Sequence, residues 1–261
     1  MDDRNEPPPA ASSPPHGSLL ALALTAPVAG AVAGFVVALF RVVLDAADRW
    51  RDALVAHAHA HSMPFAGFAL TIAGCAAAVA AAAALVRRFA PYASGSGIPQ
   101  VEAALTGDLP AAPPQLLPVK FVGGLLAIGA GMALGREGPS VQMGAVIAHM
   151  VGRIFRRAWP DLRILLAAGA GAGLAVTFNA PIAGAVFVLE ELVRRFETRT
   201  AIAAIGASST AILISRLMLG QAPDFHVAVQ ALGATGPLPY AGAATWPFYI
   251  VLGAAAGLAA A

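Results

Sequence analysis

Long apolar stretches without a single charged residue alternate with short polar connections along most of the chain. After Glu6 the next charged residue is Arg41, and further uncharged runs cover 53–86, 164–189 and 200–215. An α-helix needs about 20 apolar residues to cross the hydrocarbon core of a bilayer. The pattern therefore predicts membrane-spanning helices at about 18–44, 65–86 and 200–218, two shorter helices within 164–189, and a final apolar run at about 243–261.

A segment rich in glycine and proline at residues 91–99 interrupts this pattern, and a short helix is predicted after it, at about 97–106. Ser96 occupies an N-cap-like position at the start of that helix. There its hydroxyl and the adjacent backbone N–H groups can point at one anion. A serine that only caps the helix explains the same pattern, so this segment alone leaves both interpretations open.

A second break, at residues 135–144, carries a charged pair between two long apolar stretches. Pro139 suits the first turn of a helix, where its missing N–H group costs nothing, so a helix is predicted from Glu137 to about Met150. Glu137 then lies beside free amides at the positive end of the helix dipole. At membrane depth this is an anion site that already holds a carboxylate. The alternative is a structural capping glutamate, although an acidic residue within a span costs about 2.5–3.5 kcal/mol on insertion scales.

Between these two breaks, the sequence predicts a polar turn at 107–116 and an apolar helix at 117–134. Lys120, the only lysine of the chain, lies near the start of that helix. Its amine either extends to the membrane interface or faces the protein interior, where it adds positive potential near an anion path. The sequence leaves these two positions equally open.

The uncharged run at 164–189 contains an Asn-Ala-Pro sequence at 179–181, which predicts a bend between two shorter helices. The second of these helices ends at Glu190 and Glu191, just before a pair of arginines. Discontinuous helices at mid-membrane are typical of transporter binding sites. For Glu191, an ordinary interfacial ion pair of little energy is the alternative to a functional role.

Composition agrees with a membrane protein. Hydrophobic residues make up 58% of the 261 and charged residues 11%, whereas soluble domains carry about 25% charged residues. The apolar blocks do not alternate with polar positions as the strands of a membrane β-barrel do. The sequence therefore predicts an all-α, polytopic membrane protein. Because the arginines form no long run with aromatic residues between them, a nucleic-acid partner is not expected.

Basic residues give the chain an expected orientation. Their clusters at 87–88, 153–163 and 194–199 should share the cytoplasmic side of the membrane. Residues 1–17 are predicted to be a disordered cytoplasmic tail, because they are rich in proline and charge and lack the pattern of a signal peptide.

A polar connection with three alternating histidines is expected at 45–64. His57, His59 and His61 could bind a metal weakly, but no acidic or cysteine ligand completes a set, so a solvated loop is favoured and no metal site is predicted. Cys75, the single cysteine, is interpreted as a small packed side chain.

Three motifs together resemble the CLC family of chloride channels and proton/chloride exchangers. They are Gly-Ser-Gly-Ile-Pro at 95–99, Gly-Arg-Glu-Gly-Pro at 135–139, and the glycine-rich block that begins at 169 and runs through 179–181 to Glu191. The likeness covers the chain from about residue 20 to its C-terminus. It implies a domain at 18–261 with broken and re-entrant helices, which would form the first inverted repeat of a CLC-type pore and the start of the second. It also implies a multi-pass protein of the inner or plasma membrane that works as a homodimer.

The resemblance also assigns roles to individual residues. Ser96 resembles the serine whose hydroxyl holds the central chloride, and Glu137 the external glutamate that gates the pore. Glu191 resembles the inner glutamate that accepts protons in exchangers. Lys120 lies in a segment like that of the family's buried lysine. The implied chloride-binding set is Ser96, Gly97, Ile98, Arg136 and Gly138. Chloride and protons are then the transported ions, the lipid bilayer is the surrounding partner, and no cofactor is expected.

The chain departs from the family pattern in holding only the first repeat and the start of the second. The later glycine-rich helix start and the tyrosine that helps to hold the central anion have no counterpart. A bare anion loses tens of kcal/mol of hydration on burial, and two helix dipoles at up to ~2 kcal/mol each cannot offset that. We therefore expect a chain that lacks a complete pore by itself and is apparently truncated.

Three alternatives to a proton-coupled antiporter follow. The first is a passive chloride channel of the voltage-gated type, and the second is an inactive fragment. The third is an intramembrane enzyme, which needs a nucleophile and a base at membrane depth. Ser96 has no obvious partner for that role, and His149 is the one buried-looking histidine, so enzymatic activity is not expected.

Overall fold

The computed structural model describes residues 18–60, 64–111 and 113–220, and a few single residues between 247 and 257. The expected tail at 1–17 and most of the predicted loop at 219–240 and run at 243–261 lie outside the described residues. Two units are distinguished, Met1–Ala222 and Pro223–Ala261, and the account below concerns the first. Its long helices are α1 (Leu19–Ala60), α2 (Pro64–Phe89), α4 (Leu116–Gly129), α5 (Glu137–Ile154), α6 (Trp159–Phe178) and α8 (Thr198–Leu219). Its short elements are η1 (Pro91–Ala93), α3 (Ile98–Thr106), α7 (Pro181–Phe187) and η2 (Val188–Leu192).

The protein is all-α over the described residues and is built to cross a membrane. Four helices are long and apolar enough to span it, namely α1, α2, α6 and α8, and α4 is a shorter apolar helix. The side chains of α2 are mostly exposed, with Phe65 at 88% and Leu70 at 76%. In an integral membrane protein such side chains face lipid rather than water.

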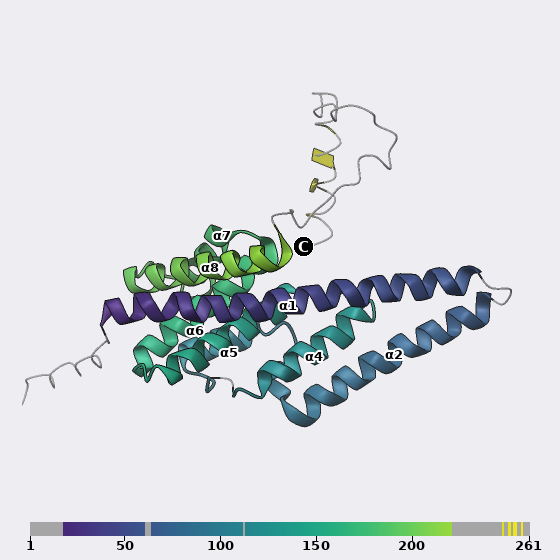
Figure 1. Cartoon of the computed structure of the whole chain (residues 1–261), viewed down its shortest axis with the longest axis horizontal. Helices are drawn as coiled ribbons and strands as arrows, with labels where there is room; N and C mark the ends of the chain where they lie inside the picture. Colours follow the sequence, from purple (N-terminus) through teal and green to yellow (C-terminus); the bar gives the residue numbers. More distant parts are fainter. Residues whose placement is uncertain are drawn as a thin grey trace, which may run out of the picture. The chain divides into compact units, whose positions relative to one another are not determined.

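The core forms where α1, α5, α6 and α8 pack together, as Figure 1 shows. Small residues let these helices approach closely. A Cβ atom placed on Gly144 of α5 would lie 2.2 Å from the carbonyl oxygen of Gly169 on α6, and one on Gly173 would lie 2.1 Å from that of Ser140. The glycine-rich block of the sequence is therefore the packing surface that brings α6 against α5, and it holds the start of α5 in place.

Gly144→Ala is expected to destabilise the protein because the added methyl group has no room. Overpacking of this kind typically costs about 1–3 kcal/mol. Gly74→Ala, in α2, is the matched control, since a Cβ there meets nothing within 4 Å and alanine favours the helix. Thermal unfolding in detergent should show a lower melting temperature for Gly144→Ala only. Equal melting temperatures for the two variants would contradict the close contact between α5 and α6.

The prediction of a polar connection at 45–64 is wrong for residues 45–60, because these residues continue α1. No glycine or proline interrupts this stretch, and its charges support the helix by pairing within it, with Arg51 Nη1 2.6 Å from Asp48 Oδ1. The 42 residues of α1 extend about 60 Å at 1.5 Å per residue, about twice the hydrocarbon thickness. His57 is exposed on this helix, while the side chains of His59 and His61 lie outside the described residues.

Two other helix boundaries also differ from the prediction. The helix predicted at 117–134 ends at Gly129, and Gly131 follows with a φ of 92° that reverses the chain. The helix that begins at Glu137 continues past Met150 to Ile154. Residues 130–135 therefore form a non-helical connection between α4 and α5.

The predicted bend at 179–181 is confirmed. Asn179 has a φ of 52°, a left-handed conformation that asparagine tolerates, and Pro181 then begins α7. The short α7 passes into η2, a π-helical turn that contains Glu190 and Glu191. Single π-turns inside helices occur frequently at functional sites.

Candidate functional site

The structure brings Ser96 and the start of α5 into direct contact. A Cβ atom on Gly138 would lie 2.3 Å from the carbonyl oxygen of Ser96 and 2.8 Å from its Cα atom. Only glycine permits this approach. Residues that are far apart in the sequence, the Ser96 loop and the N-terminus of the Glu137 helix, therefore form one site.

Gly97, rather than Ser96, is the N-cap of α3, so the predicted capping role of Ser96 needs correction. Gly97 has a φ of 95°, and the Ile98 N–H group lies 3.4 Å from Ser96 Oγ. That hydrogen bond is long, and Ser96 is exposed. The hydroxyl is consequently available to a ligand, together with the free N–H groups in the first turn of α3.

Lys120 faces the interior, which decides between its two predicted positions. Its side chain is 4% exposed, and its Nζ donates to the carbonyl oxygens of Ala93 at 2.9 Å and of Gly95 at 2.8 Å. The amine thereby ties the Ser96 loop to α4. The carbonyl oxygens of the loop carry partial negative charge, which repels an anion. The positive charge of the lysine lies against these oxygens and offsets that repulsion.

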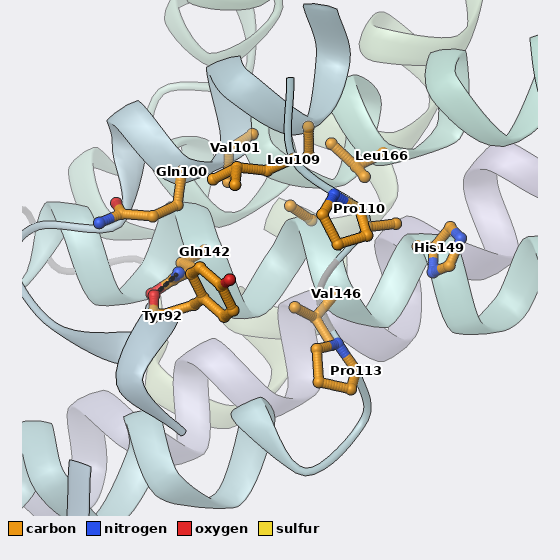
Figure 2. Close-up of a pocket in the computed structure, with 13 residues that line it drawn as sticks. Tyr92, Gln100, Val101, Leu109, Pro110, Pro113, Gln142, Val146, His149 and Leu166 are labelled. Carbon is orange, nitrogen blue, oxygen red and sulfur yellow. Dashed lines mark hydrogen bonds between the residues drawn. The ribbon is translucent and has the colours of Figure 1, made fainter. Parts of the chain in front are cut away.

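Gln142 is a second support of the loop, and the sequence analysis missed it. Its Nε2 donates to the carbonyl oxygen of Tyr92 at 2.9 Å, and Figure 2 shows the two residues side by side at the edge of a largely apolar pocket. A Cβ atom on Gly97 would lie 2.5 Å from Gln142 Oε1. The one signal for Gln142 in the sequence is its side-chain amide within a long apolar helix. A buried amide needs a hydrogen-bond partner.

Glu137 begins α5, as predicted, and is half-buried. Its carboxylate turns back over Gly135, since a Cβ atom on that residue would lie 2.0 Å from Glu137 Oε2. The positive end of the helix dipole and the free amides of the first turn lie at this position. Ser140 Oγ donates to the carbonyl oxygen of Arg136 at 2.7 Å, which fixes the first turn.

Arg136 directs its guanidinium group toward α1 rather than into the loop. Its Nη1 lies 3.9 Å from Asp45 Oδ1. The backbone of Arg136 is the N-cap of α5, so the chloride-binding role that the resemblance implies for this residue stays a prediction about its backbone. Gly138 contacts the Ser96 backbone, and the Ile98 N–H group faces Ser96 Oγ.

Glu191 lies apart from this site, on η2, and it is exposed. One of the two arginines that the sequence offered as its ion-pair partners binds elsewhere, because Arg194 Nη2 lies 2.7 Å from Glu102 Oε1 on α3. Arg194 has a φ of 55°, and its Nε donates to the backbone carbonyl of Glu191 at 3.2 Å. The turn that carries Glu191 is thus tied to α3, the helix that begins at the Ser96 loop.

The structure gives no support to a serine–histidine pair. Ser96 contacts Gly138, and His149 follows Gly138 on α5 by eleven residues, or about 16 Å along the helix axis. Proton transfer needs hydrogen-bond distance. Within the described parts of the chain there is also no group of three or more His, Cys, Asp or Glu side chains that could hold a metal ion.

Fold and site together define a helical membrane protein in which two helix N-termini, a serine hydroxyl and a glutamate meet. The family model described as voltage gated chloride channel matches residues 77–261. The chain therefore belongs to the CLC chloride channel and transporter family, as the three motifs indicated.

The similar proteins are transporters of roughly twice the length. The H(+)/Cl(-) exchange transporter ClcA of Citrobacter koseri is 40% identical over 241 residues, which are 90% of this chain and 48% of the relative. The ClcA of Vibrio cholerae is 50% identical over 140 residues, covering 52% of this chain and 30% of the relative. The crystal structure of a slow cyanobacterial Cl⁻/H⁺ antiporter matches with a TM-score of 0.74 at 39% identity, over 77% of this chain and 48% of that one. The chain thus spans about half the length of these proteins.

Lys120→Met is expected to loosen the Ser96 loop. Each lost hydrogen bond to a charged group is worth about 1.5–3 kcal/mol, and the Ala93 carbonyl stays buried without its donor. Hydrogen exchange should become faster at the amides of residues 94–98, with a lower melting temperature. Lys120→Arg, which keeps charge and donors, should retain part of the protection. Unchanged exchange in Lys120→Met would show that Lys120 does not hold the loop.

Proposed function

We propose that this chain contributes to proton-coupled chloride antiport, with Ser96 holding chloride and Glu137 acting as the gate. The observation that supports the proposal is the contact of Gly138 with the Ser96 backbone, because it brings the loop that carries the serine against the start of α5, where Glu137 lies. The relatives named as H(+)/Cl(-) exchange transporters support the same function.

The gate depends on competing electrostatic effects at one position. The N-terminus of α5 favours the Glu137 carboxylate by about 0.3–2 kcal/mol, whereas burial and a bound chloride ion both oppose its charge. Protonation of Glu137 therefore responds to anion occupancy and to the external pH. When it is deprotonated, the carboxylate occupies an anion position, and when it is protonated, it leaves that position to chloride. This exchange couples the two ions.

Glu191 is proposed as the acceptor of protons on the inner side. Its exposure and its position on a π-turn support this role. The basic clusters at 87–88, 153–163 and 194–199 support an orientation with these segments and the N-terminus in the cytoplasm, in the inner or plasma membrane. Chloride and protons are cargo, and the proposal needs no cofactor.

The pore is proposed to need a second half in addition to these residues. Ser96 is exposed and Glu137 only half-buried, whereas an anion stripped of water needs contacts on all sides. We also propose a homodimer. Exposed apolar side chains on α7 and α8, such as Ile182, Ile205 and Leu213, offer a surface that a second copy can cover.

Chloride efflux from proteoliposomes tests the proposal in two arms. One arm contains this chain alone, and the other a chimera in which this chain replaces the matching first half of the Citrobacter koseri relative. Efflux in the chimera only is the expected result and would show that the chain supplies half of a transport site. Efflux in both arms would show that it transports alone, and efflux in neither would favour an inactive fragment. Efflux without proton movement would favour the passive channel.

A further inference from the structure

A second polar pocket lies where the ends of four elements meet, away from the Ser96–Glu137 site. It has a volume of about 290 Å³ and is formed by the end of α3, η2, and the first turns of α6 and α8. Its polar part is made by Arg163, Arg195, Glu197 and Thr200, and its apolar part by side chains such as Leu105 and Ile164. The pocket thus combines a charged wall with an apolar one.

Toward the described residues, the two arginines keep N–H donors that have no acceptor. A guanidinium group has five N–H donors, and Arg163 gives one from Nη2 to the carbonyl oxygen of Leu105. Among the described residues, no carboxylate lies within 4.0 Å of the charged nitrogens of Arg163 or Arg195. The lining carries two positive charges, from the arginines, and one negative charge, from Glu197. Glu197 Oε2 accepts a hydrogen bond from Thr200 Oγ1 at 3.1 Å.

Two nearby acidic groups are already paired with other arginines, whereas Asp108 accepts a hydrogen bond from Thr106, which also lines the pocket. Asp161, fully buried, lies between Arg157 and Arg199, and Glu102 binds Arg194. In addition, α6 and α8 both direct their N-termini to this end of the protein, and partial positive charge at these termini favours an anion. The combination of guanidinium groups and free amides suits the oxygens of a phosphate group.

From this arrangement we propose that the pocket binds the phosphate group of an anionic phospholipid. The exposed aromatic residues beside it place it at the level of lipid headgroups: Trp159 is 48% exposed and Phe196 79%, and aromatic side chains concentrate at membrane interfaces. Basic pockets between membrane helices on the cytoplasmic side bind such headgroups. The apolar wall would then contact the glycerol and the first methylene groups of the lipid.

Native mass spectrometry of the full chain in neutral detergent tests the pocket with three probes: dioleoylphosphatidylglycerol, dioleoylphosphatidylcholine and inorganic phosphate. The chain should retain the phosphatidylglycerol in preference to the phosphatidylcholine. One arginine near the membrane surface contributes about 1 kcal/mol to such binding, so Arg195→Gln should weaken it about fivefold. Arg195→Lys keeps the charge but loses the forked geometry of the guanidinium group. Its affinity for phosphatidylglycerol should lie between that of the unmodified chain and that of Arg195→Gln.

Arg88→Gln is the matched control, because Arg88 belongs to another basic cluster and does not line this pocket. It should leave phosphatidylglycerol binding unchanged. An equal loss in Arg88→Gln and Arg195→Gln would overturn the proposal in favour of general attraction to the surface. Displacement of the lipid by millimolar inorganic phosphate would show a site for free anions. Equal retention of the two lipids would show that no headgroup site exists. None of these outcomes depends on chloride transport.

Discussion

Glu137→Gln in the chimera should leave chloride efflux intact and reduce proton movement to the level of protein-free vesicles. Glutamine has nearly the shape of a protonated glutamate, so it keeps the anion position open, but it cannot take up or release a proton. Glu137 is the acidic side chain at the start of α5, the helix that contacts Ser96, so its replacement should remove proton uptake and release at the gate. Simultaneous recording of chloride efflux and external pH measures both effects.

Glu190→Gln is the control for this experiment. Glu190 is exposed and precedes Glu191 on η2, so its loss should leave both chloride and proton movement in place. If Glu137→Gln still moved protons at the rate of the unmodified chimera, Glu137 would not be the gate, and its position at the helix N-terminus would be structural only.

Asp161→Asn should cause the largest loss of stability in the protein. Asp161 is fully buried in the first turn of α6, with Arg157 and Arg199 on either side of its carboxylate, the latter at 3.1 Å. Arg157 also donates to the carbonyl oxygen of Ser18, so one carboxylate connects the ends of α1, α5, α6 and α8. Removing its charge takes the buried carboxylate away from two partly buried guanidinium groups, and breaking a buried charge pair typically costs about 3–5 kcal/mol.

Denaturant unfolding in detergent measures this loss, with Asp108→Asn as the matched control. The Asp108 carboxylate accepts a hydrogen bond from Thr106 at the exposed end of α3, where losing the charge should change the free energy of unfolding by less than about 1 kcal/mol. If the two substitutions destabilise the protein equally, the buried network does not hold the helix ends together.

The sequence predicted the parts of the site that depend on the backbone near each motif. Pro139 and the adjacent glycine indicated a helix start at Glu137, and Asn179 with Pro181 indicated a break between α6 and α7, because local chain chemistry decides both. The all-α membrane fold followed from the uncharged runs. These features need no knowledge of which helix packs against which.

The residues that support the site could not be found in the same way. The two hydrogen bonds of Lys120 span 27 and 25 positions, and that of Gln142 spans 50, so only the tertiary fold decides their partners. Asp161 is an acidic residue within the basic cluster at 153–163, and its full burial between two arginines depends on the tertiary fold. The error at residues 45–60 has a different cause: charge was interpreted as a loop signal, although ion pairs between successive turns support a helix.

The most direct test of the central claim is whether chloride efflux drives protons against their own electrochemical gradient. Proteoliposomes with the chimera are loaded with chloride and diluted into low chloride at equal pH, with valinomycin and potassium holding the membrane potential at zero. Antiport predicts that chloride leaves and protons enter, so the external pH rises above its starting value until a protonophore collapses the difference. Chloride efflux at constant external pH would contradict the account.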